Sequence, residues 1–142
     1  MAGDPVVGRW RLVSYVARAD DGSIAYPLGP NPTGSLVYTA GGWMSAHLAA
    51  TDRSQLATDD LGGGNEADRA AAYASYFAYC GTYAISGETI VHNVEMSLLP
   101  NWVGTDQVRY FEVNRDELLL RTPPIEIGGT TLVSDLTWAR VE

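Results

Sequence analysis

Hydrophobic and polar residues alternate along most of the chain, and short clusters of turn residues interrupt the alternation. Residues 6–18, VVGRWRLVSYVAR, are rich in Val, Tyr and Trp and are followed by an Asp-Gly turn. The Gly41-Gly42 pair separates two alternating runs, at 35–40 and 43–49, and predicts a hairpin. Further strands are expected at 82–86, 89–98, 106–113, 118–124, 125–127 and 131–141.

Residues 24–34, IAYPLGPNPTG, interrupt this series with three prolines, at positions 27, 30 and 32. Each proline lacks the N–H that a strand donates to its neighbour, so this segment is expected to be an edge strand or a loop. The whole pattern predicts eight to ten short strands joined by tight turns.

One helix is expected, over about residues 66–80, because alanine predominates there. Asn65 is placed to cap it, Glu66 and Asp68 suit its first turn, and Gly81 is expected to end it. An apolar face that must pack against the rest of the fold is formed by Ala70, Tyr73, Tyr76, Phe77 and Cys80.

A single helix cannot cover a sheet of this size. We therefore predict an all-β fold, an antiparallel meander closed into a barrel, because closure removes the exposed sheet edges. Neither a linker nor an internal repeat divides the sequence, so residues 1–142 are expected to form one domain.

The charge of the chain excludes several classes of partner. The formal net charge is −8, the isoelectric point is about 4.6, and the nine basic residues are all arginines. No basic stripe is present to neutralise nucleic-acid phosphates or an anionic membrane surface. For a complete chain without a secretory signal or a long apolar run, the expected location is the cytoplasm, with Cys80 as a buried, inert thiol.

Two short motifs at the chain ends resemble lipocalin-type barrels. Gly8-Arg9-Trp10 opens the first expected strand, and Trp138-Ala139-Arg140 lies at the end of the last one. Lipocalin-type barrels carry a Gly-x-Trp on the first strand and an arginine from the far end of the chain that packs across the indole. Such a contact is worth about 0.5–2 kcal/mol and would join the first strand to the last.

Longer segments resemble the bacterial and fungal lipocalin-like domain family, small calycin-type barrels that are distinct from the secreted lipocalins. They are GRWRLVSY, YPLGPNPTGSLVYTAGGWMSAHL, YFAYCGTYAI, VEMSLLPNWVGTDQVRYFE and LLLRTPP, in this order. The resemblance implies the barrel fold. It leaves the function open, since members of such barrels are suggested to be ligand binders or to be cyclases and isomerases of secondary metabolism.

Polar residues on the expected strands are the candidate chemical groups. Alternation places His92 on one strand face with Val94, and places Glu95 on the other face. His92 and Glu95 are the candidate catalytic residues, since an imidazole titrates near neutrality and a carboxylate in a pocket can move a proton. The alternatives are a half-exposed histidine and a structural ion pair between Glu95 and Arg109.

Aromatic residues suggest a cavity for a flat or apolar molecule, although core packing explains many of them. The aromatics considered are Tyr38, Trp43, Tyr73, Tyr76, Tyr79, Tyr83, Trp102 and Phe111. The expected binding residues are Tyr38, Trp43, His47, Tyr76, Tyr83, Trp102, Arg109, Phe111 and Arg121. Trp102, in the turn after Pro100, is expected to fold over one barrel end, either as a plug or as a lid.

Several chemistries lack their sequence signatures. The two histidines form no metal-binding cluster, and no nucleophile elbow, phosphate loop or dinucleotide motif is present. We therefore expect no metal and no cofactor. Three functions remain open: binding of a small hydrophobic molecule, a cofactor-free cyclase or isomerase on a polyketide-like substrate, and a structural module with a filled barrel. A homodimer also remains open.

Overall fold

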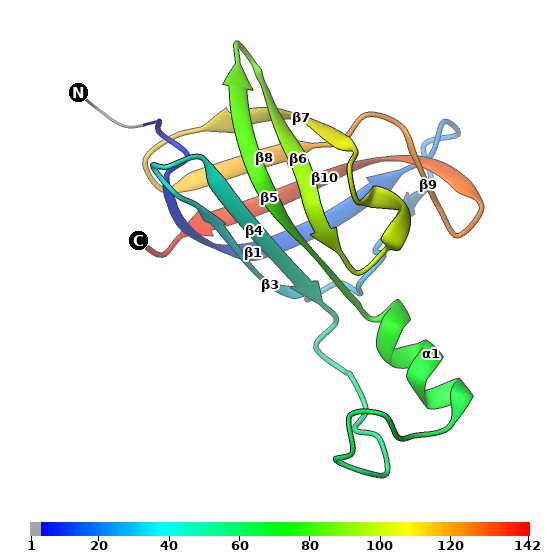
Figure 1. Ribbon diagram of the computed structural model, residues 1–142. Coiled ribbons are helices and arrows are strands. Elements are labelled where there is room, and N and C mark those ends of the chain that lie inside the picture. The colour runs from blue at the N-terminus through cyan, green and yellow to red at the C-terminus, as the bar shows by residue number, and fades with distance from the viewer. Residues whose placement is uncertain (1–3) are drawn as a thin grey trace.

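The first and last long strands of this protein pair with each other, and this pairing closes an antiparallel sheet into a barrel (Figure 1). The computed structural model describes residues 4–142. The barrel strands are β1 (Gly8–Arg18), β3 (Thr33–Tyr38), β4 (Trp43–Ala49), β5 (Tyr76–Ser86), β6 (Thr89–Ser97), β7 (Asp106–Val113), β8 (Glu117–Arg121) and β10 (Thr130–Arg140). Two short strands, β2 (Ile24–Ala25) and β9 (Ile125–Ile127), extend β1 and β10 outside the closed ring. The predicted all-β barrel is confirmed.

Alternation along each strand sends every second side chain into the barrel. On β3 and β4, for example, Leu36, Tyr38, Met44 and Ala46 are buried, and the residues between them are half-buried or exposed. The inward side chains of all barrel strands form one hydrophobic core. Within residues 24–34, the two-residue edge strand β2 is followed by a loop that holds the three prolines, as expected, and β3 begins at Thr33.

Two β-bulges change which residues point inward. On β1 the register with β10 shifts between Leu12 and Ser14, so Val13 is an extra residue and Tyr15 points toward the core as Leu12 does. On β6 the register with β5 shifts in the same way, and Glu95 is the extra residue between Val94 and Met96. A strict alternation read from the sequence is therefore wrong beyond each bulge.

The helix is shorter than the sequence pattern predicts. Helix α1 spans Glu66–Ala74, with the Asn65 side chain accepting a hydrogen bond from the Asp68 N–H at 2.8 Å as expected for an N-cap. Residues 76–80, predicted to continue the helix, belong instead to strand β5. Burial of Phe77 and Tyr79 against the barrel interior stabilises the strand more than alanine propensity stabilises the helix.

The same error affects Gly81 and Cys80. Gly81 lies inside β5 rather than at a helix end, and a Cβ at this position would collide with the backbone carbonyl of Asn93 on β6. Glycine is therefore required by the close approach of the two strands at the β6 bulge. Cys80 is half-buried on β5, not buried in a helix.

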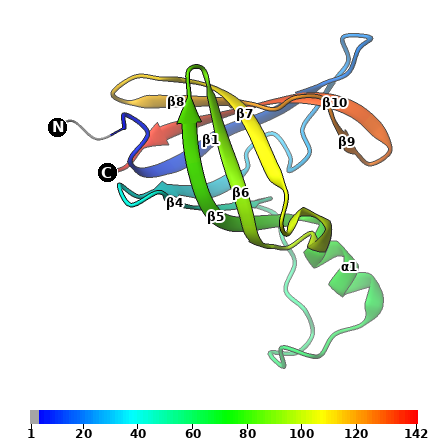
Figure 2. The same cartoon turned by 45° about the horizontal axis from the view of Figure 1, so that its top comes forward.

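Helix α1 and the polar segment before it project away from the barrel (Figure 2). None of the helix side chains is buried, so the expected apolar face does not pack into the core, although Tyr73 of its last turn lies beside the barrel opening. Within residues 4–142, no helix has the length and apolar character needed to cross a bilayer.

Arg140 joins the two ends of the chain at one end of the barrel. Trp10 and Arg140 are paired across β1 and β10, and the guanidinium lies 4.2 Å from the indole centroid, which is the contact expected from the sequence. The same guanidinium donates hydrogen bonds to the carbonyls of Pro5, Val7 and Arg115. A Cβ at Gly8 would collide with the Glu142 backbone carbonyl and lie 2.8 Å from the Arg140 guanidinium, so glycine is required where the two chain ends meet.

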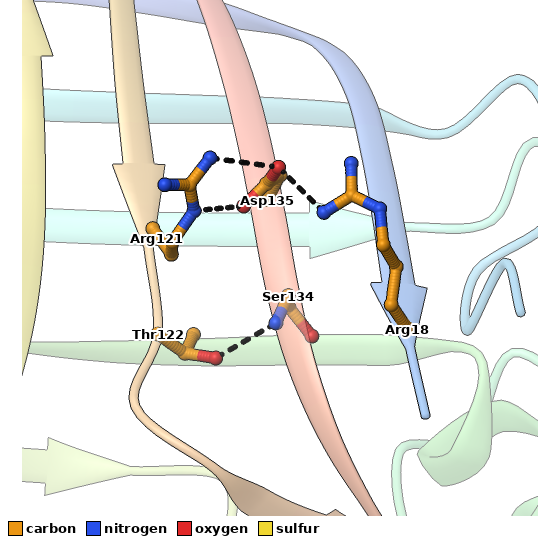
Figure 3. A network of polar contacts seen from close by, with 5 residues as sticks. All are labelled: Arg18, Arg121, Thr122, Ser134 and Asp135. Carbon is orange, nitrogen blue, oxygen red and sulfur yellow. Dashed lines mark hydrogen bonds and ion pairs between the residues drawn. The ribbon is translucent and has the colours of Figure 1, made fainter. Parts of the chain in front are cut away.

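On the outer face, Asp135 of β10 links three neighbouring strands (Figure 3). It accepts hydrogen bonds from Arg18 of β1 at 2.9 Å and from Arg121 of β8 at 2.7 Å. Mainly because of the hydrogen bond from Arg121, the pKa of the Asp135 carboxyl lies below its ordinary value. The residue before Asp135 on β10 makes a second contact near the end of β8. The Ser134 N–H donates to the hydroxyl of Thr122, which follows the last residue of β8 and precedes Pro123.

We expect Arg140→Ala to lower the free energy of unfolding by about 2–3 kcal/mol, because it removes the cation–π contact and the hydrogen bonds to three carbonyls. Urea denaturation measures the change. Arg11→Ala, an exposed arginine on the same strand as Trp10, is the control and should change stability by about 0.5 kcal/mol or less. Equal effects of the two substitutions would contradict the proposed role of Arg140.

We expect Asp135→Asn to lower the free energy of unfolding by about 1 kcal/mol at neutral pH, a small value because both arginines are half exposed. The folded-state pKa is depressed, so the stabilisation is complete above the unfolded value near 3.8 and is lost as the pH falls through the folded pKa. Denaturation curves of the two proteins should therefore converge in acid. The control Asp20→Asn, at an exposed position in the turn after β1, should leave the free energy of unfolding at neutral pH unchanged.

Candidate functional site

The barrel contains a cavity of about 710 Å³. One end of the barrel is filled by core side chains around Trp10, and the cavity occupies the other end, near β9 and the short 3₁₀ helix η1 (Pro100–Trp102). The last turn of α1 and the residues after β2 also contribute to its rim, through Tyr73 and Leu28. The cavity argues against the alternative of a structural module with a filled barrel.

The cavity wall is mostly apolar and aromatic. Its main apolar side chains are Leu28, Leu36, Leu48, Phe77, Leu98, Leu99, Leu120, Leu136 and Trp138, with Tyr15, Tyr76, Tyr79 and Trp102 adding polar atoms on aromatic rings. Such a wall suits a molecule that is itself flat and largely apolar.

Trp102 forms part of this wall. It packs edge-on against Phe77 and Tyr79 of β5, with ring centroids 4.9 and 5.2 Å away. The loop between β6 and β7 thus folds its large apolar ring back over the open end of the barrel. Of the two roles expected from the sequence, plug or lid, a ring that lines the cavity fits the lid.

Arg109 is the one basic residue among the cavity-lining side chains. It lies on β7 with its side chain inside the barrel, is 5% exposed, and has its guanidinium 5.7 Å from the Trp102 ring centroid. One guanidinium N–H donates to the Val108 carbonyl. Within residues 4–142 no carboxylate forms an ion pair with it, and the ion pair with Glu95 considered from the sequence is not formed.

Tyr79, His92 and Tyr38 form a hydrogen-bonded chain that runs from the cavity wall into the core. The Tyr79 hydroxyl lies 2.7 Å from His92 Nδ1, and the Tyr38 hydroxyl lies 2.6 Å from His92 Nε2. Only Tyr79 lines the cavity, whereas His92 and Tyr38 are buried behind it.

Burial dominates the titration of these groups. It lowers the pKa of His92 to about 3, with a further contribution from the positive charge of Arg109, so the imidazole is neutral at physiological pH. Burial also raises the pKa of Tyr38 and of Tyr79, while the nearby Arg109 guanidinium opposes the rise. His92, expected to titrate near neutrality, is therefore not placed to act as a general base at the cavity.

Glu95, the other candidate catalytic residue, is exposed on the outer face of the barrel. Alternation along the sequence predicts that Glu95 lies on the other strand face from His92. In the structure it does, as the extra residue of the β6 bulge that has no partner on β5. Its predicted role in a cavity is corrected accordingly, since its side chain does not line the cavity.

Three of the expected binding residues also point outward. Trp43 is 40% exposed and shares the outer face of β4 with His47, which is bonded through Nδ1 to the Tyr76 hydroxyl at 2.6 Å. Arg121 is half exposed and pairs with Asp135. None of the three lines the cavity, because each alternates with buried neighbours that do face inward.

Other expected binding residues lie inside the barrel but away from the cavity. Tyr83 donates to the Thr39 carbonyl and packs edge-on against Tyr38, at the filled end. Phe111 packs against the core. Of the expected set, the structure brings Tyr76, Trp102 and Arg109 together around the cavity.

Three aromatic residues of the cavity wall were not foreseen as such. Tyr15 is brought inward by the bulge on β1, for which the sequence gives no signal. Phe77 was assigned to the helix rather than to a strand. Trp138 could have been found, because Leu132, Ser134, Leu136 and Trp138 alternate along β10. The Trp138 indole N–H is buried and has no hydrogen-bond partner within the described residues.

For residues 4–142 the structure shows no group of three or more His, Cys, Asp or Glu side chains able to hold a metal ion. The chemistry available at the cavity is that of hydrogen-bonding side chains and the positive charge of Arg109 in an apolar wall, with the exposed Glu126 of β9 as the carboxylate among the described lining residues.

Comparison with known proteins agrees with this architecture. The sequence profile described as lipocalin-like domain matches residues 7–141. The chain belongs to the lipocalin-like domain family. A relative of this chain, the 4'-hydroxy-3'-methoxypropiophenone carrier protein of Aspergillus oryzae, is 33% identical over 107 residues, covering 69% of this chain and 96% of that protein.

Among solved structures, a lipocalin-like protein from Bacteroides uniformis is 15% identical, with 96% of this lipocalin-like chain and 99% of that chain covered and a TM-score of 0.49. The REP1-NXSQ fatty acid transporter is 13% identical, with 96% of each chain covered and a TM-score of 0.40. These similarities are too low to indicate a ligand.

We expect Arg109→Met to raise the free energy of unfolding by about 1–2 kcal/mol, because it removes a buried positive charge that lacks an anionic partner. Thermal and urea denaturation measure this change. Arg121→Met, which breaks an ion pair on the outer face, is the matched control and should lower stability slightly. A clear loss of stability in Arg109→Met would show that the charge is compensated in the empty protein.

Proposed function

We propose that this lipocalin-like protein binds a small, largely apolar aromatic molecule inside its barrel. The observation that carries the proposal is the aromatic cavity of about 710 Å³, which contains one buried cation. Pockets for small molecules typically measure roughly 300–1,000 Å³, and are apolar with few polar groups.

The arrangement of the wall supports an aromatic ligand in particular. Phe77, Tyr79 and Trp102 already pack edge-to-face, so a flat ring entering beside them finds both ring faces and ring edges to contact. Arg109 next to Trp102 offers hydrogen bonds to a polar atom of the ligand.

The named relative supports the same ligand class. It is called a carrier of a phenolic aryl ketone, and its alignment covers nearly its whole length. We propose that the present protein likewise carries or sequesters a phenolic or ketonic aromatic compound, with 4'-hydroxy-3'-methoxypropiophenone as the first compound to test.

The alternative of a cofactor-free cyclase or isomerase lacks the residues named for it. His92 is buried behind Tyr79, and Glu95 lies on the outer face. We therefore propose binding without a reaction.

We expect Trp102→Ala to weaken binding of 4'-hydroxy-3'-methoxypropiophenone by roughly tenfold, the effect of losing about 1.4 kcal/mol of aromatic contact. Isothermal titration calorimetry measures the dissociation constant, and the melting temperature shows that the variant is folded. The matched control is Trp43→Ala, since Trp43 is a half-exposed tryptophan on the outer face. Its dissociation constant should stay unchanged; an equal loss in both variants, or no loss in Trp102→Ala, would contradict binding in this cavity.

A further inference from the structure

The hydrogen-bonded chain Tyr79–His92–Tyr38 constrains where each of its protons lies. Because His92 is neutral, one of its ring nitrogens is a donor and the other an acceptor. Both nitrogens contact a tyrosine hydroxyl, so one tyrosine must donate to His92 and the other must accept from it.

Tyr38 decides between the two arrangements. Its hydroxyl is fully buried, and the contact with His92 Nε2 is its one hydrogen bond within the described residues. If Tyr38 accepted a proton from Nε2, its own O–H would be left without an acceptor in the core, which costs about 1–3 kcal/mol. If Tyr38 donates to Nε2, its hydroxyl is satisfied.

The proton of His92 then resides on Nδ1 and is donated to the oxygen of Tyr79. The Tyr79 oxygen thus accepts a hydrogen bond from His92, and the Tyr79 O–H donates to neither of the other two members of the hydrogen-bonded series. Tyr79 lines the cavity, so its proton is available to a group bound there.

Arg109 adds a positive charge at the same place. Its guanidinium lies close enough to the Tyr79 hydroxyl to influence the titration of that group, and it packs on Trp102. The buried Arg109 has no carboxylate partner within residues 4–142. A buried cation is favourable only with a compensating anion. Glu126, the carboxylate among the described cavity-lining residues, is exposed on β9 and forms no ion pair with Arg109.

We propose that the cavity recognises an anionic oxygen of its ligand through the Tyr79 hydroxyl and the Arg109 guanidinium, and that Tyr38, acting through His92, keeps the Tyr79 proton available for that oxygen. This inference rests on the proposed function and adds the chemical class of the ligand: an aromatic molecule with a phenolate or carboxylate. Tyr79 and Arg109 contact the ligand, whereas Tyr38 and His92 are positioning residues.

The proton arrangement is testable without a ligand. Proton–nitrogen correlation spectra of the isotope-labelled protein distinguish the two tautomers of a histidine ring, and His47→Asn assigns the signals, since the chain has two histidines. We expect His92 to carry its proton on Nδ1, and Tyr38→Phe to shift the population toward Nε2. A proton on Nε2 in the unaltered protein would overturn the positioning role of Tyr38.

Binding tests the recognition itself, with the phenolic probe and its O-methyl ether. We expect the phenol to bind at least about tenfold more tightly than the ether, as a charge-assisted hydrogen bond predicts, and to show the phenolate absorption band when bound at neutral pH. An aryl carboxylate of similar size, compared with its methyl ester, forms the second arm and tells whether the cavity prefers carboxylate or phenolate.

Removing single tyrosine hydroxyl groups tests which residues produce the preference for the phenol over the ether. Tyr79→Phe and Tyr38→Phe should each reduce the preference for the phenol about tenfold while leaving the affinity for the ether unchanged. Tyr83→Phe is the matched control. Tyr83 packs against Tyr38, but its hydroxyl donates to the Thr39 carbonyl and takes no part in the Tyr79–His92–Tyr38 hydrogen bonds. Its preference should equal that of the unaltered protein.

The outcomes separate the two proposals. Equal affinity for the anionic and neutral member of both pairs would overturn the recognition of an anionic oxygen and leave the binding function standing. An unchanged preference in Tyr38→Phe would overturn its positioning role. Failure of all probes to bind would contradict the proposed function, and this inference with it.

Discussion

The barrel depends on the pairing of its first strand with its last, because this is the step that turns an open sheet into a closed one. Arg140 fixes that pairing at one point by stacking on Trp10 and by bonding to carbonyls before β1 and after β7. One side chain thereby joins both chain termini and a distant turn. Because these contacts gather at one end of the barrel, that end is filled, and the free space lies at the other.

The open end is shaped by departures from regular strands. The bulge on β1 turns Tyr15 inward, and the loop after β6 folds Trp102 back over the interior. The bulge on β6 leaves both Glu95 and Met96 exposed and demands a glycine on the neighbouring strand. Irregularities of this kind occur where a sheet must re-aim side chains. In this barrel they separate a packed half from a hollow one and leave aromatic rings around the hollow.

Few polar groups lie inside this apolar barrel, and burying each of them costs free energy unless it is hydrogen-bonded or neutral. His92 avoids the cost of a buried charge by staying neutral between two hydroxyls, so both of its nitrogens are bonded. Arg109 cannot lose its proton, and among the described residues it bonds to the Val108 carbonyl and packs on the Trp102 ring without an ion-pair partner. The proposed ligand contacts therefore lie at Arg109 and Tyr79 rather than at His92.

Period-two alternation, turn residues and the Gly-x-Trp and arginine at the chain ends were enough to determine an antiparallel barrel and the contact between Trp10 and Arg140, because these signals are local or belong to a family pattern. They also indicated Tyr76, Trp102 and Arg109 as binding residues. They could not show that residues 76–80 form a strand, since helix propensity and strand burial compete there and only packing decides. Nor could they locate the bulges, which reverse the facing of every later residue, or reveal which buried cation would lack a partner: both depend on the contacts made when distant strands meet.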